Sequence, residues 1–177
     1  MYKMKVQLKL FSYLLLLSLC FNCLNAQERV SPENKKIERQ LLKQIDTKRM
    51  TYKLYKELFK IHPDIKIFKN IIAAKKNDFS TLVDYAEKNY PELKTGPLNG
   101  LFKVRETEKL YSEWLKKGKA SSKSAVDVSV DLEKADDEDI SGFLKMDLEP
   151  ELVAILERLK QSSKKHLATF RRKKTRS

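Results

Sequence analysis

Two charged residues interrupt an apolar stripe in the segment of residues 65–89. The apolar positions of this segment recur at the spacing of one face of an α-helix; they are Phe68, Ile71, Ile72, Phe79, Leu82, Val83 and Ala86. Lys75 and Asp78 fall on the same face, about one helical turn apart. Because an unpaired charge is costly to bury, other parts of the chain must supply partners or a metal ion.

Two other long segments have the same helical periodicity. The first begins at Pro32, which suits the first turn of a helix, and must end near Pro63. The last begins at Pro150. The inward row of the first segment is Ile37, Leu41, Ile45, Lys48, Tyr52, Tyr55 and Phe59, and that of the last is Leu152, Ile155, Leu156, Leu159, Ser162, Ser163, His166 and Phe170. Each segment therefore predicts a helix with one buried face.

The region between residues 95 and 145 predicts shorter elements. A turn cluster at residues 95–100 precedes a helix expected over residues 104–117. Residues 121–135 predict another helix, although their alternating residues 126–131 would also suit a strand, and residues 137–145 predict a separate short helix. The apolar residues of the 104–117 helix are Leu110, Tyr111, Trp114 and Leu115, and the inward residues of the next are Ala125, Val128, Leu132 and Ala135. With four glycines in 177 residues, the chain predicts an all-α bundle whose crossover connection carries a short helix.

Residues 1–26 have the pattern of a signal peptide. Lys3, Lys5 and Lys9 form a positively charged n-region, residues 11–19 form a Leu-rich apolar run, and Ala26 ends a small-residue cleavage site. An uncleaved anchor is the alternative; a lipoprotein is disfavoured because a bulky Leu in residues 17–20 stands where a lipobox requires a small residue. We therefore predict a periplasmic or secreted protein, with a helical domain over residues 27–170 and a basic tail over residues 171–177.

Cysteine usage and missing motifs narrow the possible chemistry. Cys20 and Cys23 both lie in the predicted signal segment, so the remaining 151 residues have no thiolate nucleophile, disulfide or cysteine zinc site. The chain also lacks a glycine-rich phosphate loop, a Gly-x-Ser-x-Gly elbow and a His-Glu-x-x-His pair. These observations favour a non-enzymatic protein.

The chain is strongly basic, with 37 Lys and Arg against 24 Asp and Glu. Without residues 1–26 the net charge is +10, which suits an anionic surface or an acidic protein, but equally serves solubility. The tail at residues 171–177 either binds such a surface or complements the dipole of the last helix. Nucleic acid fits less well, because Phe170 is the one aromatic residue close to the tail.

Polar residues fall at inward positions on four predicted helices. Lys48 lies on the first, Lys75 with Asp78 on the second, Glu133 with Asp136 after the crossover, and His166 on the last. Carboxylates and histidines on facing helices are how helical bundles build metal sites. The alternatives are that both lysines extend outward past their neighbours, that Glu133 and Asp136 are surface acids, and that His166 is a hydrogen-bonded core residue.

The same segments resemble a known family. Residues 46–55, 68–78, 100–111, 133–144 and 158–170 follow, in order, the motifs of the ferritin-like family catalogued as domain of unknown function 2202. The last match, Arg158-Leu159-Lys160-Gln161-Ser162-Ser163-Lys164-Lys165-His166-Leu167-Ala168-Thr169-Phe170, is the most specific. The resemblance implies a bundle that would hold a pair of metal ions.

This chain departs from the family pattern at the positions that would bind metal. Where the family has Glu on its first two helices, this chain has Thr47 or Lys48 and Lys75, and Asp78 replaces the family's His. Iron and manganese sites need several anionic oxygens, and an ammonium group instead adds positive charge. We therefore hypothesise a degenerate metal site, in which Lys48 and Lys75 stand in for the metals within a buried polar network.

Two functions follow from these alternatives. The preferred one is an exported, non-enzymatic binding or scaffold module without a cofactor. The other is a redox or metal-storage protein that holds iron or manganese through Glu133, Asp136, His166 and Asp78.

Overall fold

The computed structural model describes residues 32–175, which are all-helical apart from turns and loops. The helices are α2 (Pro32–Ile61), α3 (Ile67–Asn89), α4 (Arg105–Gly118), α5 (Ser122–Phe143) and α6 (Pro150–Lys174). The all-α prediction is confirmed. The predicted signal peptide lies outside the described residues. Residues 36–175 belong to one compact unit, and the following description concerns that unit alone.

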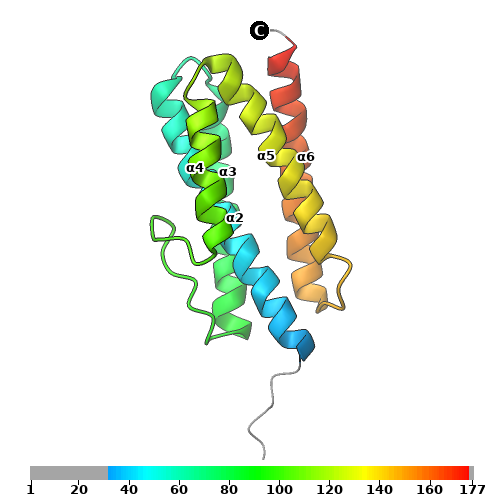
Figure 1. Cartoon of the computed structure of the whole chain (residues 1–177). Coiled ribbons are helices and arrows are strands. Elements are labelled where there is room, and N and C mark those ends of the chain that lie inside the picture. The colour runs from blue at the N-terminus through cyan, green and yellow to red at the C-terminus, as the bar shows by residue number, and fades with distance from the viewer. Residues whose placement is uncertain (1–31, 176–177) are drawn as a thin grey trace, which may run out of the picture. The chain divides into compact units, whose positions relative to one another are not determined.

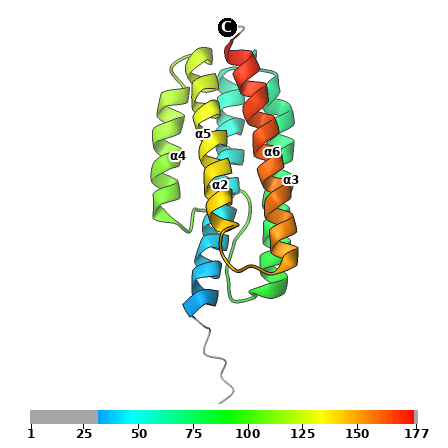
Figure 2. The same cartoon turned by 90° about the vertical axis from the view of Figure 1, so that its right-hand side faces the viewer.

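The chain runs up and down the bundle in two antiparallel pairs. Helix α2 is antiparallel to α3, and α5 is antiparallel to α6 (Figure 1). Residues 90–104 and α4 form the crossover that returns the chain to the end where α5 begins, so α3 and α5 point the same way (Figure 2). Helix α5 packs along α6 and against α4. The predicted crossover with a short helix is therefore present.

Helix α5 is longer than the sequence indicates. Instead of two helices and a possible strand, residues 122–143 form one helix, capped by Ser121, whose Oγ accepts a hydrogen bond from Ser124 N at 3.0 Å. Val126 and Ser129 are buried together with the predicted Ala125, Val128 and Leu132. This burial has helical periodicity, so the strand interpretation of residues 126–131 is wrong. The acidic residues 136–139 continue the helix and do not start a new one.

Two other helices differ from expectation at their surfaces. Leu110, expected on the apolar face of α4, is 41% exposed, whereas Tyr111, Trp114 and Leu115 are partly buried. Helix α6 continues to Lys174, so residues 171–174 of the predicted basic tail are part of the last helix. Lys174 Nζ pairs with Asp127 Oδ1 of α5 at 2.7 Å, which helps to hold this last turn.

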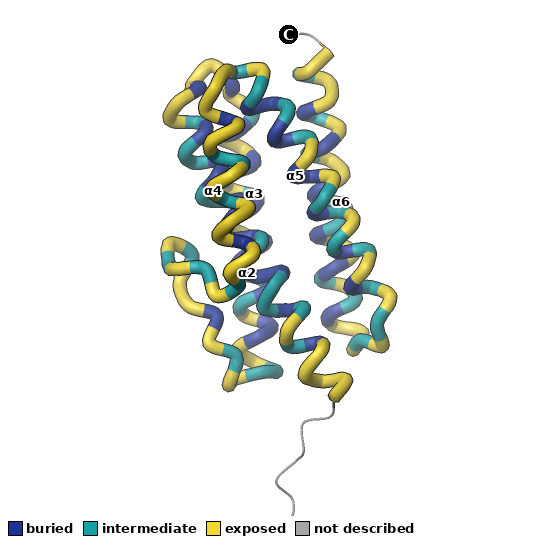
Figure 3. Tube along the Cα trace, viewed as in Figure 1, coloured by how far each residue is buried: buried dark blue, intermediate teal, exposed yellow. Residues whose placement is uncertain are grey.

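Buried residues recur along the helices of the bundle (Figure 3), and the apolar ones form two clusters. One cluster contains Ile37, Leu41, Ile45, Phe79, Leu82, Tyr85, Ala86, Ile140, Phe143, Leu152, Leu156 and Leu159. The other contains Met50, Leu54, Tyr55, Leu58, Ile65, Phe68, Ile71, Ala125, Val126, Val128, Leu132 and Phe170. Every long helix carries at least one buried polar residue between these two sets in sequence: Lys48 on α2, Lys75 and Asp78 on α3, Glu133 and Asp136 on α5, and Ser163 on α6. The bundle therefore has a polar layer between two apolar halves.

The crossover is fastened to α2 by a buried arginine. The guanidinium of Arg49 is fully buried and donates to three consecutive carbonyl oxygens in residues 95–97, including that of Gly96 at 3.1 Å. Gly96 has a φ of 71°, a conformation that favours glycine. This turn allows three carbonyl groups to converge on one side chain.

The same arginine pairs with a buried carboxylate on its own helix. Asp46 Oδ1 accepts a hydrogen bond from Arg49 Nη1. The other oxygen, Asp46 Oδ2, accepts from the backbone N–H groups of residues 103 and 104, at 2.5 and 2.6 Å. The pair thus holds the middle of the loop of residues 90–104 and its end next to α4. No role for this pair was predicted from the sequence.

Candidate functional site

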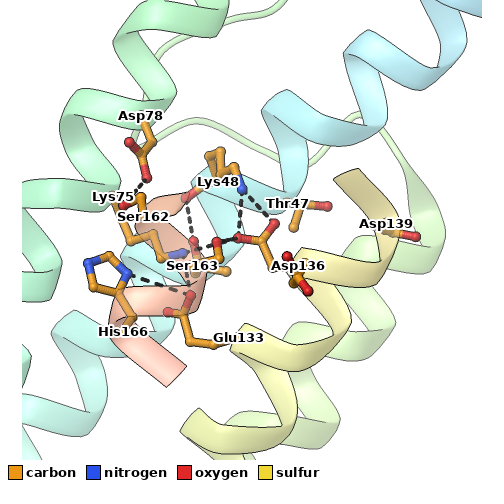
Figure 4. Close-up of polar contacts among 12 residues, drawn as sticks. Thr47, Lys48, Lys75, Asp78, Glu133, Asp136, Asp139, Ser162, Ser163 and His166 are labelled. Atoms are coloured by element: carbon orange, nitrogen blue, oxygen red, sulfur yellow. Dashed lines mark hydrogen bonds and ion pairs between the residues drawn. The ribbon is translucent and has the colours of Figure 1, made fainter. Parts of the chain in front are cut away.

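The polar layer contains two lysines that are completely buried. Lys48 of α2 and Lys75 of α3 have no solvent-exposed surface, and their ammonium groups point towards α5 (Figure 4). Neither side chain extends outward past its neighbours. Both lie on the inward rows of their helices, between the two apolar clusters, where water cannot solvate them. Their charges must therefore be balanced by protein groups.

Asp136 of α5 is the shared partner of both lysines. Lys48 Nζ lies 2.5 Å from Asp136 Oδ1 and 2.6 Å from Oδ2. Lys75 Nζ lies 3.1 Å from the same Oδ2. Ser163 Oγ of α6 donates to Oδ2 as well, at 2.6 Å. Four helices thus converge on one carboxylate, which is 2% exposed.

Glu133, one turn earlier on α5, completes the coordination of Lys75. Lys75 Nζ donates to Glu133 Oε2 at 2.8 Å, and the Tyr55 hydroxyl donates to Oε1 at 2.7 Å. The Tyr55 ring stacks on Phe170 with centroids 5.7 Å apart, which fixes the direction of its hydroxyl. Both oxygens of this fully buried carboxylate therefore have donors.

Two of the predicted site residues lie at the edge of this network. Asp78 of α3 is 5% exposed and accepts a long hydrogen bond from Ser162 Oγ at 3.5 Å, while the Lys75 ammonium group turns to α5 instead. His166 Nδ1 lies 3.6 Å from Glu133 Oε2, too far for a direct hydrogen bond.

The pKa directions follow from burial and opposite charge. Burial raises the pKa of Asp136, but the charges of Lys48 and Lys75 outweigh burial and the net pKa is lowered. The pKa of Glu133 is also lowered, since Lys75 and His166 outweigh burial. Burial lowers the pKa of the Lys75 ammonium group, yet the surrounding carboxylates raise it overall. All three groups are therefore ionised at neutral pH.

The pKa values of Asp78 and Tyr55 are raised, whereas those of Glu133 and Asp136 are lowered. Burial raises the pKa of Asp78, and the more distant lysines compensate only in part. Burial, and then the charge of Glu133, raise the pKa of the Tyr55 hydroxyl well above its usual value. Tyr55 therefore stays a hydrogen-bond donor, and Asp78 is the least well compensated acid of the layer.

The charged residues of the network were predicted from the sequence, and two hydroxyl groups were not. Lys48, Lys75, Glu133 and Asp136 meet in the structure, and His166 and Asp78 flank them. Tyr55 and Ser163 were placed on inward rows but given no polar partner. The sequence feature that could have indicated them is their spacing from the charged residues on the same helix faces. Tyr55 lies two turns beyond Lys48, and Ser163 lies about one turn before His166.

A small cavity adjoins the network between α2, α4 and α5. Its volume is about 310 Å³, and its walls include Met50, Trp114, Leu132 and the buried Asp136. Lys43 and Asp139 form an ion pair at its edge, with 2.8 Å between Nζ and Oδ2. The cavity brings a mainly apolar surface close to the carboxylate that both buried lysines share.

The residues of the layer do not fit a pair of metal ions. A dication would need the oxygens of Asp136 and Glu133, and ammonium groups lie within 2.5–3.1 Å of those oxygens. Among residues 32–175, moreover, no three His, Cys, Asp or Glu side chains gather as metal ligands would. Glu133, Asp136, His166 and Asp78 thus form no common ligand set in this structure.

The fold and the site define a class of protein: an all-α bundle with a crossover helix and an ion-paired polar layer at its middle. The chain belongs to the family described as Uncharacterized protein domain (DUF2202), whose pattern matches residues 38–176. Its fold is similar to that in the crystal structure of a hypothetical protein from Methanococcus jannaschii, with a TM-score of 0.73 and 21% sequence identity. The similarity covers 85% of this chain and 84% of the other. No curated protein matches the chain significantly.

Proposed function

We propose that this chain is an exported, non-enzymatic ferritin-like domain that serves as a binding or scaffold module. In this proposal the ammonium groups of Lys48 and Lys75 occupy the place that metal ions would take in a ferritin-like bundle. The two antiparallel helix pairs and the crossover support the ferritin-like assignment. The signal-peptide pattern of residues 1–26 supports export.

The observation that carries the proposal is the position of Asp136 between two ammonium groups. Lys48 Nζ and Lys75 Nζ lie 2.6 and 3.1 Å from the same oxygen. A cation that approached this oxygen would meet two fixed positive charges at short range in a medium of low dielectric constant. Such a layer favours a fixed, inert centre over one that binds and releases metal.

A metal-loading experiment tests the proposal. The purified protein would be incubated with Fe²⁺ or Mn²⁺, dialysed and analysed for bound metal, while oxygen uptake is followed during iron addition. We expect no stoichiometric metal and no iron oxidation above the buffer rate. Stoichiometric metal or rapid oxygen uptake would instead support a redox or storage protein that uses Glu133, Asp136, His166 and Asp78. Amino-terminal sequencing of the exported form tests cleavage after Ala26.

A further inference from the structure

The net charge of the bundle is concentrated at one of its ends. Three segments meet there: the α2–α3 turn with its flanking residues 60–69, the α4–α5 turn with residues 116–127, and the end of α6 at residues 171–175 (Figures 1 and 2). We call these residues the basic end. They contain eleven Lys and Arg and two Asp and Glu. The remaining residues of the range 36–175 contain twenty of each, so the basic end carries the entire net charge of +9.

Specific contacts hold the three segments together. His62 Nε2 lies 2.9 Å from Gly118 O, and His62 Nδ1 lies 3.4 Å from Ser122 Oγ. Gly118 permits this approach, because a Cβ atom at that position would lie 2.7 Å from Leu58 Cδ2. The α2–α3 and α4–α5 turns therefore join through His62, for which the sequence predicted no role.

The end of α6 is fixed to the same face through the pair of Lys174 with Asp127. Lys60 and Lys117 also have acidic partners, Glu57 at 2.6 Å and Asp131 at 3.2 Å, both just outside the basic end. Most of the other cations of the basic end are solvent-exposed: Lys66, Lys69, Lys116, Lys119, Lys123, Arg171 and Arg172. Seven of the eleven cations lie outside α6. The surface is thus larger than the C-terminal tail.

We infer that the basic end binds the surface of an anionic lipid bilayer. The cations lie at the tips of elements from three parts of the chain, an arrangement that an extended anionic surface can contact from one side. Ile61, also at this end, is 41% exposed and could enter the interfacial region between lipid headgroups. Clustered Lys and Arg bind anionic lipid headgroups through their summed charge.

The composition of the basic end favours lipid over nucleic acid. Binding of single strands without sequence preference uses exposed aromatic rings on which bases stack. Phe68 is the one aromatic residue in the three segments, and it is completely buried. No helix among residues 32–175 is long and apolar enough to cross a bilayer, so the contact would be peripheral. The inference rests on the proposed role as a binding module and names its partner.

Vesicle sedimentation with matched charge variants tests this inference. The end variant carries Lys66→Gln, Lys69→Gln, Lys116→Gln and Lys119→Gln. The control variant carries Lys76→Gln, Lys94→Gln, Lys109→Gln and Lys145→Gln, which removes the same charge from exposed positions elsewhere. Both keep residues 1–31, so any lipid affinity of that segment is common to all forms. Circular dichroism verifies that both variants fold.

We expect the wild type and the control variant to bind vesicles that contain phosphatidylglycerol, and to bind much less to phosphatidylcholine or in high salt. The end variant should bind about tenfold more weakly or worse. Equal losses in the two variants, or no preference for phosphatidylglycerol, would overturn the inference. Heparin or single-stranded DNA that binds the basic end when vesicles do not would reassign the partner. None of these outcomes bears on metal binding, so the proposed inert centre stands or fails separately.

Discussion

The ammonium nitrogen of Lys48 lies within 2.6 Å of both carboxylate oxygens of Asp136. Lys48 belongs to α2, which precedes the crossover in the sequence, and Asp136 belongs to α5, which follows it; the two residues are 88 positions apart. Because Lys75 shares one of these oxygens, a single aspartate neutralises parts of two buried cations. This arrangement makes the layer sensitive to the loss of any one member, although the intact network need not add stability over an apolar core.

Replacement of Lys75 by Met should destabilise the protein by about 3–5 kcal/mol, since Glu133 would remain buried without its cation. The free energy of unfolding in urea measures this effect. Lys43→Met is the matched control, because Lys43 forms a half-exposed ion pair with Asp139 at 2.8 Å. That change should cost no more than about 1 kcal/mol. Equal losses in the two variants would contradict the buried ionic layer.

Removal of the Tyr55 hydroxyl tests the second donor to Glu133. Tyr55→Phe leaves the ring packing in place and removes the 2.7 Å hydrogen bond to Glu133 Oε1. The unfolding free energy should fall by about 1–3 kcal/mol, the cost of an unsatisfied buried acceptor. Tyr52→Phe on the same helix, at a partly exposed position, should be nearly neutral. A neutral Tyr55→Phe would show that Glu133 has no need of this donor.

Asp136 and Asp78 should make the free energy of unfolding depend on pH in opposite directions. Asp136 has a pKa below its ordinary value, so its stabilising contribution is present above about pH 4 and is lost as the pH falls further. The deficit of Asp136→Asn relative to wild type should therefore shrink between pH 6 and pH 3, as measured by urea unfolding. A deficit that is constant over this range would contradict the charge of Asp136.

Asp78→Asn supplies the comparison of opposite sign. Burial raises the pKa of Asp78, so its ionised form lowers the stability of the folded state at neutral pH. The substitution should stabilise the protein at pH 7, and this gain should vanish as Asp78 becomes protonated in the wild type. If Asp78→Asn is instead destabilising at pH 7, Asp78 belongs to the ion-paired centre as first predicted.

The Arg49 contacts predict a specific effect on the crossover loop. Arg49→Lys keeps the charge but cannot donate to Asp46 and three carbonyl groups at once. Limited proteolysis should therefore cut the variant within residues 91–104 faster than the wild type. Arg39→Lys, at an exposed position of α2, should leave the cleavage rate unchanged. Cleavage of both variants at the wild-type rate would contradict the proposed fastening of the loop.

Regular periodicity is what made the fold and the charged residues predictable. Lys75 stands in an apolar row of fixed period, so its burial follows once the row is known to be a helix face. The length of α5 was not predictable in the same way, since the acidic residues 136–139 suit a helix start as well as a helix interior. Only the packing of Asp136 and Ile140 against other helices decides between them.

The features that the sequence did not reveal depend on which distant segments meet. Arg49 and Asp46 form an ion pair at a spacing of three residues, which is common on helices. Their role becomes visible only in the structure, where the carbonyl groups of residues 95–97 contact Arg49. His62 acquires its partners from the α4–α5 turn. The basic end is likewise invisible in the sequence, because its cations come from three separate segments that the topology brings together.

The metal content of the wild type and of a restored variant, measured in parallel, tests the central claim most directly. The variant Lys48→Glu/Lys75→Glu/Asp78→His replaces both ammonium groups with carboxylates and supplies the histidine of the family pattern. After incubation with Fe²⁺ or Mn²⁺ and dialysis, we expect the wild type to retain no stoichiometric metal and the folded variant to retain it. Stoichiometric metal in the wild type would contradict the claim that two lysines hold the centre of this bundle.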